Sequence, residues 1–212
     1  MIVTISRQAA SRGEQVAQAV AQHLGVPLVD PETVHRAAAR IDLAGENLAD
    51  PQRAERLGQR LAQLVVLLAS EPPEDSAWVL APVPTMDDVG YRRTIETMIR
   101  ALGDAGDVVI AGFPAQVILG KAPSSVHALV VAPLAVRVQR MVLREDLPFR
   151  TAERVLRDTD RERSDFYRRL YHITWDEPTL YDCVLNSARL GVEPSARVIL
   201  SAVRNRGERM SA

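Results

Sequence analysis

Arginines are concentrated in one stretch of the chain, residues 157–169, which reads RDTDRERSDFYRR. Arg157 and Arg161 are four residues apart and share one face of a helix, and a bend would bring Arg163 beside them. Asp160 is placed to orient these guanidinium groups. Clustered cations suit phosphoryl transfer, because its transition state spreads negative charge over the oxygens of the transferred group. An exposed helix held by pairs of opposite charge would show the same pattern, so both interpretations stay open.

A second candidate is the polar turn ISRQAASRG at residues 5–13, between an expected strand and an expected helix. Backbone N–H groups at the start of a helix bind anions, and we expect Arg12 at the mouth of this turn to assist them. The turn is not a Walker A motif, because Gly13 is its only glycine and no lysine follows it. The alternative is an ordinary turn with a serine capping the helix.

Two further segments place polar groups where strands are expected to end. VDPETVHRAAA at 29–39 puts Asp30 at a strand end and Arg36 about two turns into a helix, where it would clamp a phosphate or simply face solvent. YDCVLNSARLG at 181–191 ends a strand at Asn186 and Ser187.

The elements that must position these groups alternate along the chain. Short apolar runs without strict alternation are expected as strands at 1–5, 26–29, 108–111, 126–131 and 182–185. Helical periodicity separates them, at 14–24, 31–40, 91–102, 134–143 and 193–203, with Gly103 and Gly106 ending the third helix. This order predicts an α/β fold with a central parallel sheet of about five strands and helices on both faces. Ligands in such sheets bind at the carboxyl ends of the strands.

Residues 41–90 interrupt this alternation. Residues 52–69 predict an amphipathic helix whose apolar surface, with Val66 and Leu67 outside the main stripe, is wider than one contact needs. A homo-oligomer, most simply a homodimer, would bury the additional apolar surface in the contact between its subunits. Residues 71–90 hold four prolines and predict a long loop.

Composition excludes several classes of protein. The 212 residues include 26 basic and 27 acidic side chains, a formal net charge of −1, so no nucleic-acid or membrane partner is indicated. All basic residues except Lys121 are arginine. Cys183 is the only cysteine, which excludes an intrachain disulfide and a Cys-rich zinc site, and we predict no metal-binding side chains. No apolar run approaches ~18 residues, so the expected location is the cytoplasm.

The order of these motifs resembles the cytidylate-kinase-like family of P-loop nucleoside monophosphate kinase relatives. The resemblance rests on ISRQ at 5–8, VVIAG at 108–112, the run VVAPLAVRVQRMVLRE at 130–145, DRER at 160–163 and WDEPTLYDCVLN at 175–186. It implies a single three-layer P-loop kinase-like domain over 1–212, with a helical and proline-rich insertion at about 41–90 and an arginine lid at about 148–172. It also implies transfer of the γ-phosphoryl group of ATP, with Mg²⁺, to CMP or dCMP.

The resemblance assigns roles to residues that match the family pattern. For phosphate or ATP binding these are Ser6, Arg7, Ser11 and Gly13, and to them we add Arg12, which stands where the family has glycine. For the nucleoside monophosphate they are Asp30, Arg36 and Gly112, and in the lid they are Arg157, Asp160, Arg161 and Arg163.

Two departures from the family pattern fall on the site. The family loop usually reads G-S-G-G where this chain has Ala10-Ser11-Arg12-Gly13, so we expect Ala10 and Arg12 to narrow the loop. The family turn usually reads G-R-G where this chain has Gly112-Phe113-Pro114, which removes a guanidinium. An active kinase and an impaired or inactive relative that binds a nucleotide, another phosphorylated ligand or a protein partner therefore remain alternatives.

Overall fold

The computed structural model describes residues 1–41, 50–69, 88–120, 122 and 124–211. Its strands are β1 (Ile2–Arg7), β2 (Leu28–Val29), β3 (Val108–Ala111), β4 (Ser125–Val131) and β5 (Cys183–Asn186). Within these ranges they form one five-stranded sheet in the order β2-β3-β1-β4-β5, and all four pairings are parallel. The predicted parallel sheet is confirmed.

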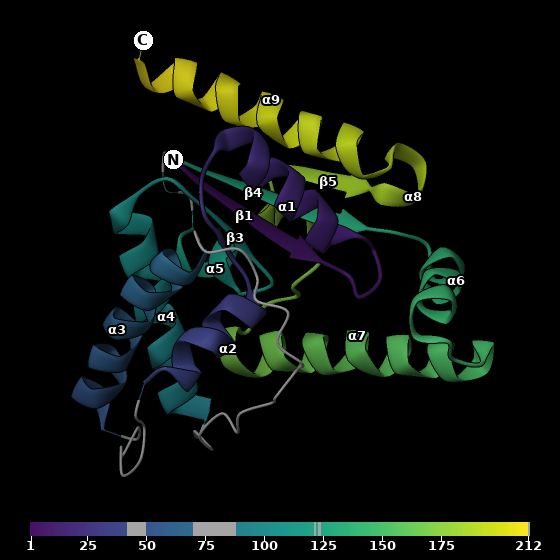
Figure 1. The fold of residues 1–212 in the computed structure, drawn as a ribbon, viewed down its shortest axis with the longest axis horizontal. Helices are drawn as coiled ribbons and strands as arrows, with labels where there is room; N and C mark the ends of the chain where they lie inside the picture. Colours follow the sequence, from purple (N-terminus) through teal and green to yellow (C-terminus); the bar gives the residue numbers. More distant parts are fainter. Residues whose placement is uncertain (42–49, 70–87, 121, 123, 212) are drawn as a thin grey trace.

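Helices cover both faces of the sheet, so the predicted three-layer architecture is confirmed as well (Figure 1). On one face lie α1 (Gly13–Leu24) and α9 (Val192–Ser211). On the other lie α2 (Pro31–Ala39), α3 (Pro51–Ala69), α4 (Asp88–Ala105) and α5 (Ala115–Ile118). At the carboxyl end of β4, α6 (Leu134–Glu145) leads into the long α7 (Phe149–Tyr171), and β5 is followed by α8 (Ser187–Leu190).

Alternate side chains of the central strands fill two separate cores. Val3 and Ile5 of β1 pack with α1 and α9, whereas Ile2 packs with α3 and α4. Because both faces are covered, residues 2–6 of β1 are all buried. This explains why the strand shows no alternation of apolar and polar residues in the sequence.

Several predicted boundaries differ from the structure. α4 continues to Ala105, so Gly103 lies inside the helix and only Gly106, with φ +95°, follows its end. α7 is one continuous helix of 23 residues, and the bend expected to bring Arg163 beside Arg157 is absent from it. The expected amphipathic helix is present as α3, with Leu57, Leu61, Val65 and Leu68 buried. Residues 70–87, which hold most of the proline-rich part of the predicted insertion, lie outside the described residues, and Asp88 begins α4 where a loop was expected.

None of the helices in the described ranges is long and apolar enough to cross a membrane.

Candidate functional site

The turn after β1 keeps a left-handed backbone at two residues that are not glycine. Ala10 has φ +56° and Arg12 has φ +64°. These are the two positions at which the resembled family loop carries glycine, the residue that adopts such angles without steric cost. The left-handed conformation is therefore present here without glycine, at a cost of ~1–2 kcal/mol per residue, and the expected narrowing of the loop by Ala10 and Arg12 stays a prediction.

Hydrogen bonds from other elements hold this strained turn. The carbonyl oxygen of Ala9 accepts a hydrogen bond from Arg137 at 3.3 Å, and that of Ala10 accepts one from Arg140 at 3.4 Å. The carbonyl oxygen of Ser11 accepts a hydrogen bond from the hydroxyl of Ser187. Three consecutive carbonyl groups are thus held from α6 and from the end of β5. We refer to these contacts as the three carbonyl anchors.

A basic pocket lies beside the turn, at the start of α1. It has a volume of about 310 Å³ and is lined by Ala10, Arg12, Glu14, Gln15, Arg140, Leu143 and Arg144. The cap residue of α1 makes no side-chain hydrogen bond to the first-turn N–H groups; the N–H of Glu14 donates to the carboxylate of its own residue. Burial lowers the pKa of Arg140, and the nearby charge of Arg12 lowers it further. We call this the loop pocket.

Arg7 lies across the entrance to the turn and reaches the neighbouring strand. Its aliphatic stem covers Gly13, and its guanidinium group lies against Gly112, at which a Cβ atom would collide with it. Its Nε donates to Oε1 of Glu14 at 2.7 Å. Burial favours a higher pKa for Glu14, but the charge and hydrogen bond of Arg7, then the hydrogen bond from the backbone N–H of Glu14 and the charge of Arg144, hold this pKa below its usual value.

Arg163 meets Arg7 from α7. Its guanidinium donates to the backbone carbonyl of Arg7 and lies 5.2 Å from the centre of the Trp175 ring. Burial, followed by the charge of Arg7, lowers the pKa of Arg163. The indole Nε1 of Trp175 donates to Ser164 on the same helix at 3.2 Å, which fixes the ring beneath the guanidinium. Two guanidinium groups, one from β1 and one from α7, therefore converge at the end of the sheet.

A second pocket, of about 650 Å³, opens on the other side of Arg163. Its lining comprises Pro31, Tyr91, Gly112, Phe113, Pro114, Thr159, Glu162, Arg163, Asp165, Phe166, Tyr167 and Arg169. Phe166 contacts Tyr91 and Tyr167 edge-on, with ring centres 5.9 and 5.7 Å apart. Burial raises the pKa of Tyr167 to about 12, so its hydroxyl stays neutral. We call this the aromatic pocket. Arg163 and Gly112 line the aromatic pocket and also contact Arg7, whereas Glu14 lines the loop pocket and contacts Arg7 from that side.

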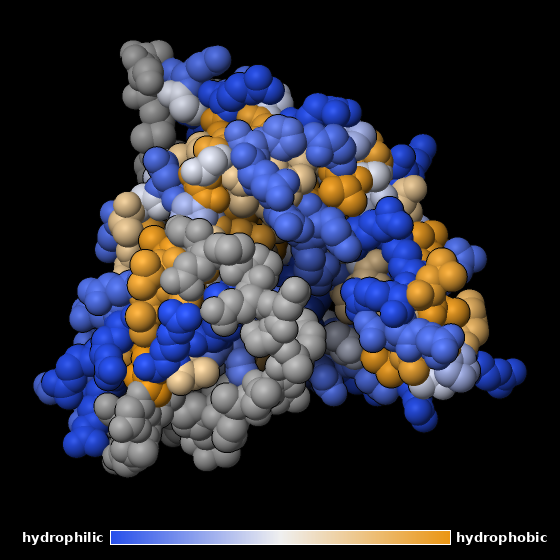
Figure 2. Space-filling view, in the orientation of Figure 1, coloured by the Kyte–Doolittle hydropathy of each residue, from blue (hydrophilic) through white to orange (hydrophobic). Residues whose placement is uncertain are grey.

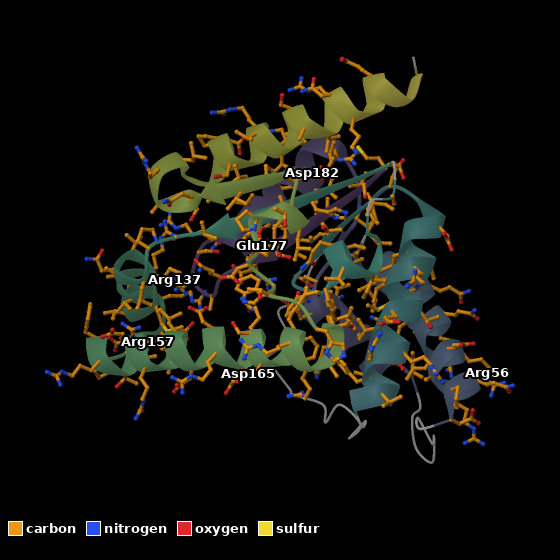
Figure 3. The ribbon with its side chains drawn as sticks, turned by 180° about the vertical axis from the view of Figure 1, so that it is seen from behind. Arg56, Arg137, Arg157, Asp165, Glu177 and Asp182 are labelled. Atoms are coloured by element: carbon orange, nitrogen blue, oxygen red, sulfur yellow. The ribbon has the colours of Figure 1, made fainter. Side chains whose placement is uncertain are left out.

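A buried ion pair fixes α7 relative to the turn. Arg137 of α6, only 4% exposed, forms a bidentate pair with Asp160 at 2.8 and 3.2 Å, and its Nε donates to the carbonyl oxygen of Ala132 at 3.1 Å. Figure 3 shows Arg137 between the end of the sheet and α7. In Figure 2 hydrophilic side chains gather around the hollow between the sheet and these two helices. One arginine thus joins β4, the turn and α7.

Comparison with known proteins decides the family. The model of the cytidylate kinase-like family matches residues 2–189. The chain belongs to the cytidylate kinase-like family. A cytidylate kinase of Methanothermobacter thermautotrophicus is 26% identical over 195 residues, which cover 92% of this chain and all of that protein.

Solved structures agree with the fold of the family. A protein from Eubacterium ventriosum superposes with a TM-score of 0.66 at 18% identity, covering 96% of this chain and 98% of the other. A shikimate kinase from Bacteroides thetaiotaomicron gives 0.50 at 11% identity, covering 96% and 98%. At these identities the likeness concerns the fold alone, which is that of a P-loop kinase.

The structure brings some of the residues assigned by the family pattern together and separates others. Arg7, Gly13, Gly112 and Arg163 converge, and Arg12 lines the loop pocket. Ser6 and Ser11 are buried, and the Ser11 hydroxyl has no hydrogen-bond partner among the described residues.

The remaining lid arginines do not reach either pocket. Arg157 is exposed and pairs with Glu153 at 2.7 Å, and Arg161 is exposed on α7. The interpretation of this segment as a charged surface helix therefore describes Arg157, whereas Arg163 belongs to the group of residues that converges at Arg7. Asp160 orients Arg137 through the bidentate pair.

Asp30 and Arg36 lie apart from both pockets. The Asp30 carboxylate accepts hydrogen bonds from the N–H and hydroxyl groups of Thr33, both at 2.8 Å, and so caps α2. Asp30 and Arg36 line a third cavity of about 690 Å³, which runs between α1, α2 and the end of α3. Pro31, next to Asp30, is the residue of this segment that borders the aromatic pocket.

Several residues of the site were not singled out from the sequence. Arg137, Arg140 and Arg144 follow an R-x-x-R-x-x-x-R spacing, which places them on one face of α6. That spacing was visible, but nothing in it identifies backbone carbonyls more than 120 residues away as partners. Glu14 and Tyr91 carry no local signal at all.

The described residues fit a triphosphate better than they fit a dedicated metal cage. The N–H groups at the start of α1 and three arginines suit phosphate oxygens. The described ranges hold no cluster of three or more His, Cys, Asp or Glu side chains that could hold a metal ion. Mg²⁺ in kinase sites is held mainly by phosphates with one or two carboxylates, and Glu14 is the carboxylate at the loop pocket.

Proposed function

We propose that this protein transfers the γ-phosphoryl group of ATP to a nucleoside monophosphate, CMP or dCMP. The observation that carries the proposal is the position of Arg7 and Arg163, which converge between a basic pocket at a helix start and an aromatic pocket. Membership of the family supports the choice of reaction, and the cytidylate kinase of Methanothermobacter thermautotrophicus supports the choice of acceptor.

Each pocket has a distinct part in this reaction. The N–H groups at the start of α1, with Arg12, Arg140 and Arg144, bind the phosphates of ATP. The aromatic pocket binds the nucleoside of the acceptor against Tyr91, Phe166 and Tyr167. When bound together with the nucleotide, Mg²⁺ would supply neutralisation of the phosphate charge.

The chemical step exchanges one phosphorus–oxygen bond for another. A phosphate oxygen of the acceptor forms a bond to the γ-phosphorus, the bond from that phosphorus to the β,γ-bridging oxygen breaks, and ADP leaves. Arg7 and Arg163 stabilise the negative charge that spreads over the transferred oxygens.

A second candidate function is nucleotide binding without transfer. It is favoured by the turn after β3, where Phe113 is only 7% exposed and Pro114 is also buried, in place of the family's arginine and glycine. It is also favoured by Glu14, an acidic residue in the first turn of the helix that faces the phosphates.

One experiment separates the two candidates. ATP and Mg²⁺ are incubated with CMP, dCMP, UMP or AMP, and diphosphate products are separated by anion-exchange chromatography, while calorimetry measures the binding of each nucleotide. The proposal predicts CDP or dCDP formation that falls at least tenfold in Arg163→Ala and is unchanged in Arg154→Ala, an exposed arginine on the same helix. Binding of ATP without any diphosphate product would support the second candidate.

A cytoplasmic location stays a prediction, supported by the substrates of the proposed reaction, ATP and a nucleoside monophosphate. A homodimer stays a prediction from the wide apolar surface of α3, on which Leu67 is 57% exposed.

A further inference from the structure

The contact between Arg7 and Glu14 occupies the place where the two pockets approach each other. The side chain of Arg7 is 13% exposed and that of Glu14 is 49% exposed. Arg7 is held by its contacts with Gly13 and Gly112, whereas Glu14 reaches it from the first turn of α1 and is half in solvent. The acid is therefore the partner that can leave at little cost.

Around Arg7, one carboxylate, that of Glu14, is available to two guanidinium groups, those of Arg7 and Arg163. Asp160 of α7, whose charge acts on Arg163, is engaged by Arg137 in a bidentate pair. Arg7 and Arg163 are close enough for the charge of Arg7 to lower the pKa of Arg163, and Glu14 is the carboxylate that contacts Arg7. The junction of the pockets thus carries an excess positive charge.

A phosphate at the start of α1 would compete with Glu14 for Arg7. The N–H groups that attract an anion belong to the turn that carries Glu14, and Glu14 lines the loop pocket. Two negative groups held so close repel each other, and a phosphate with two charges attracts a guanidinium more strongly than one carboxylate does.

We propose that Glu14 is an internal stand-in for phosphate on Arg7, and that ligand binding transfers Arg7 from Glu14 to the phosphate group. Arg7 is the residue that contacts the ligand, and Glu14 is a positioning residue that keeps the guanidinium at the junction until the ligand arrives. The inference rests on the proposed function only in requiring that phosphate binds in the loop pocket.

The test is a double-mutant cycle on the full chain. Calorimetry measures the dissociation constants of inorganic pyrophosphate and of ATP, both without Mg²⁺ and at fixed salt, for wild type, Glu14→Gln, Arg7→Met and the double variant. Glutamine keeps the shape of the acid without its charge, and methionine keeps most of the stem that covers Gly13. Melting temperatures confirm that each variant is folded.

Removing the competitor should tighten binding. Glu14→Gln is expected to lower the dissociation constant about fivefold, because an ion pair with one half-exposed partner is worth up to ~1 kcal/mol. Arg7→Met should raise it at least tenfold, as expected for losing a charge-assisted hydrogen bond of ~1.5–3 kcal/mol. In the Arg7→Met background, Glu14→Gln should give a clearly smaller gain, because only the repulsion between Glu14 and the phosphate is then relieved.

The controls separate this role from general repulsion and from failure of the proposed function. Glu153→Gln removes a comparable acid from the exposed pair with Arg157 and should leave affinity unchanged. An equal gain from Glu14→Gln with and without Arg7 would show general repulsion and overturn the proposal, as would unchanged or weaker binding in Glu14→Gln, or no binding in any variant. The predicted cycle without any diphosphate product would retain this inference and reject phosphoryl transfer, whereas product formation without the cycle would do the reverse.

Discussion

Replacement of Arg137 by methionine tests whether one buried ion pair holds the turn and α7 in place. Arg137 donates four hydrogen bonds to groups on three segments: the carbonyl oxygens of Ala132 and Ala9 and both carboxylate oxygens of Asp160. Methionine retains much of the side-chain volume but none of these donors. The variant therefore leaves a carboxylate and two carbonyl groups without their partner.

The expected loss follows from burial. Removing one member of a buried ion pair costs ~3–5 kcal/mol. Asp160 is 27% exposed, so water solvates part of the remaining charge and the lower end, about 3 kcal/mol, applies. In a domain of this size each kcal/mol lowers the melting temperature by roughly 2–4 °C, so a fall of roughly 6–12 °C is expected.

Urea unfolding followed by circular dichroism and by tryptophan fluorescence measures this loss. Agreement of the two probes establishes that unfolding is two-state. Arg137→Met combined with Asp160→Asn should recover at least ~1 kcal/mol, because no charge is then left unpaired. Arg154→Met, an exposed control, should stay within ~0.5 kcal/mol of wild type. A loss below ~1 kcal/mol in Arg137→Met, or a double variant no more stable than the single one, would refute the reasoning.

Three shorter predictions concern other parts of the site and the single cysteine. Arg12→Gly should raise the free energy of unfolding by up to ~1 kcal/mol, since glycine adopts φ +64° without strain, and should weaken ATP binding. Urea titration measures the stability and calorimetry the affinity, and an increase or a decrease of both together would contradict the prediction. Gly112→Ala should cost ~1–3 kcal/mol of stability, because φ is +82° and the new Cβ collides with Arg7; a melting temperature equal to that of wild type would contradict it. Burial raises the pKa of Cys183 to about 11, so alkylation by iodoacetamide near neutral pH should be far slower in the folded protein than in urea, and equal rates would contradict this.

The sheet was predictable because its strands are short apolar runs separated by helical periodicity. Local sequence does not encode strand order, however. Nothing in residues 108–111 indicates that β3 rather than β2 lies beside β1, since that order depends on how the helices pack on each face. The end of α4 was misplaced for a similar reason: Gly103 packs tightly against Leu119, and this tertiary contact outweighs its low helix propensity.

The site was predictable only in part, because charge patterns do not identify partners. Arg157 and Arg163 look equivalent in the sequence, yet one turns to Glu153 on the exposed face and the other to Arg7 and Trp175. A bend was expected to unite them, but in a straight helix two side chains with five residues between them lie on different faces. The converging pair is formed by residues from β1 and α7, and only the fold brings them together.

The three carbonyl anchors have a consequence for how such loops are recognised and altered. A search for phosphate loops by their glycines passes over this chain, although its turn has the left-handed residues that glycines normally supply. The backbone conformation of residues 9–11 is fixed by hydrogen bonds from Arg137, Arg140 and Ser187. A nine-residue peptide or a graft of residues 5–13 into another sheet would therefore lose this shape, whereas side chains within the loop are free to change as long as the distant donors remain.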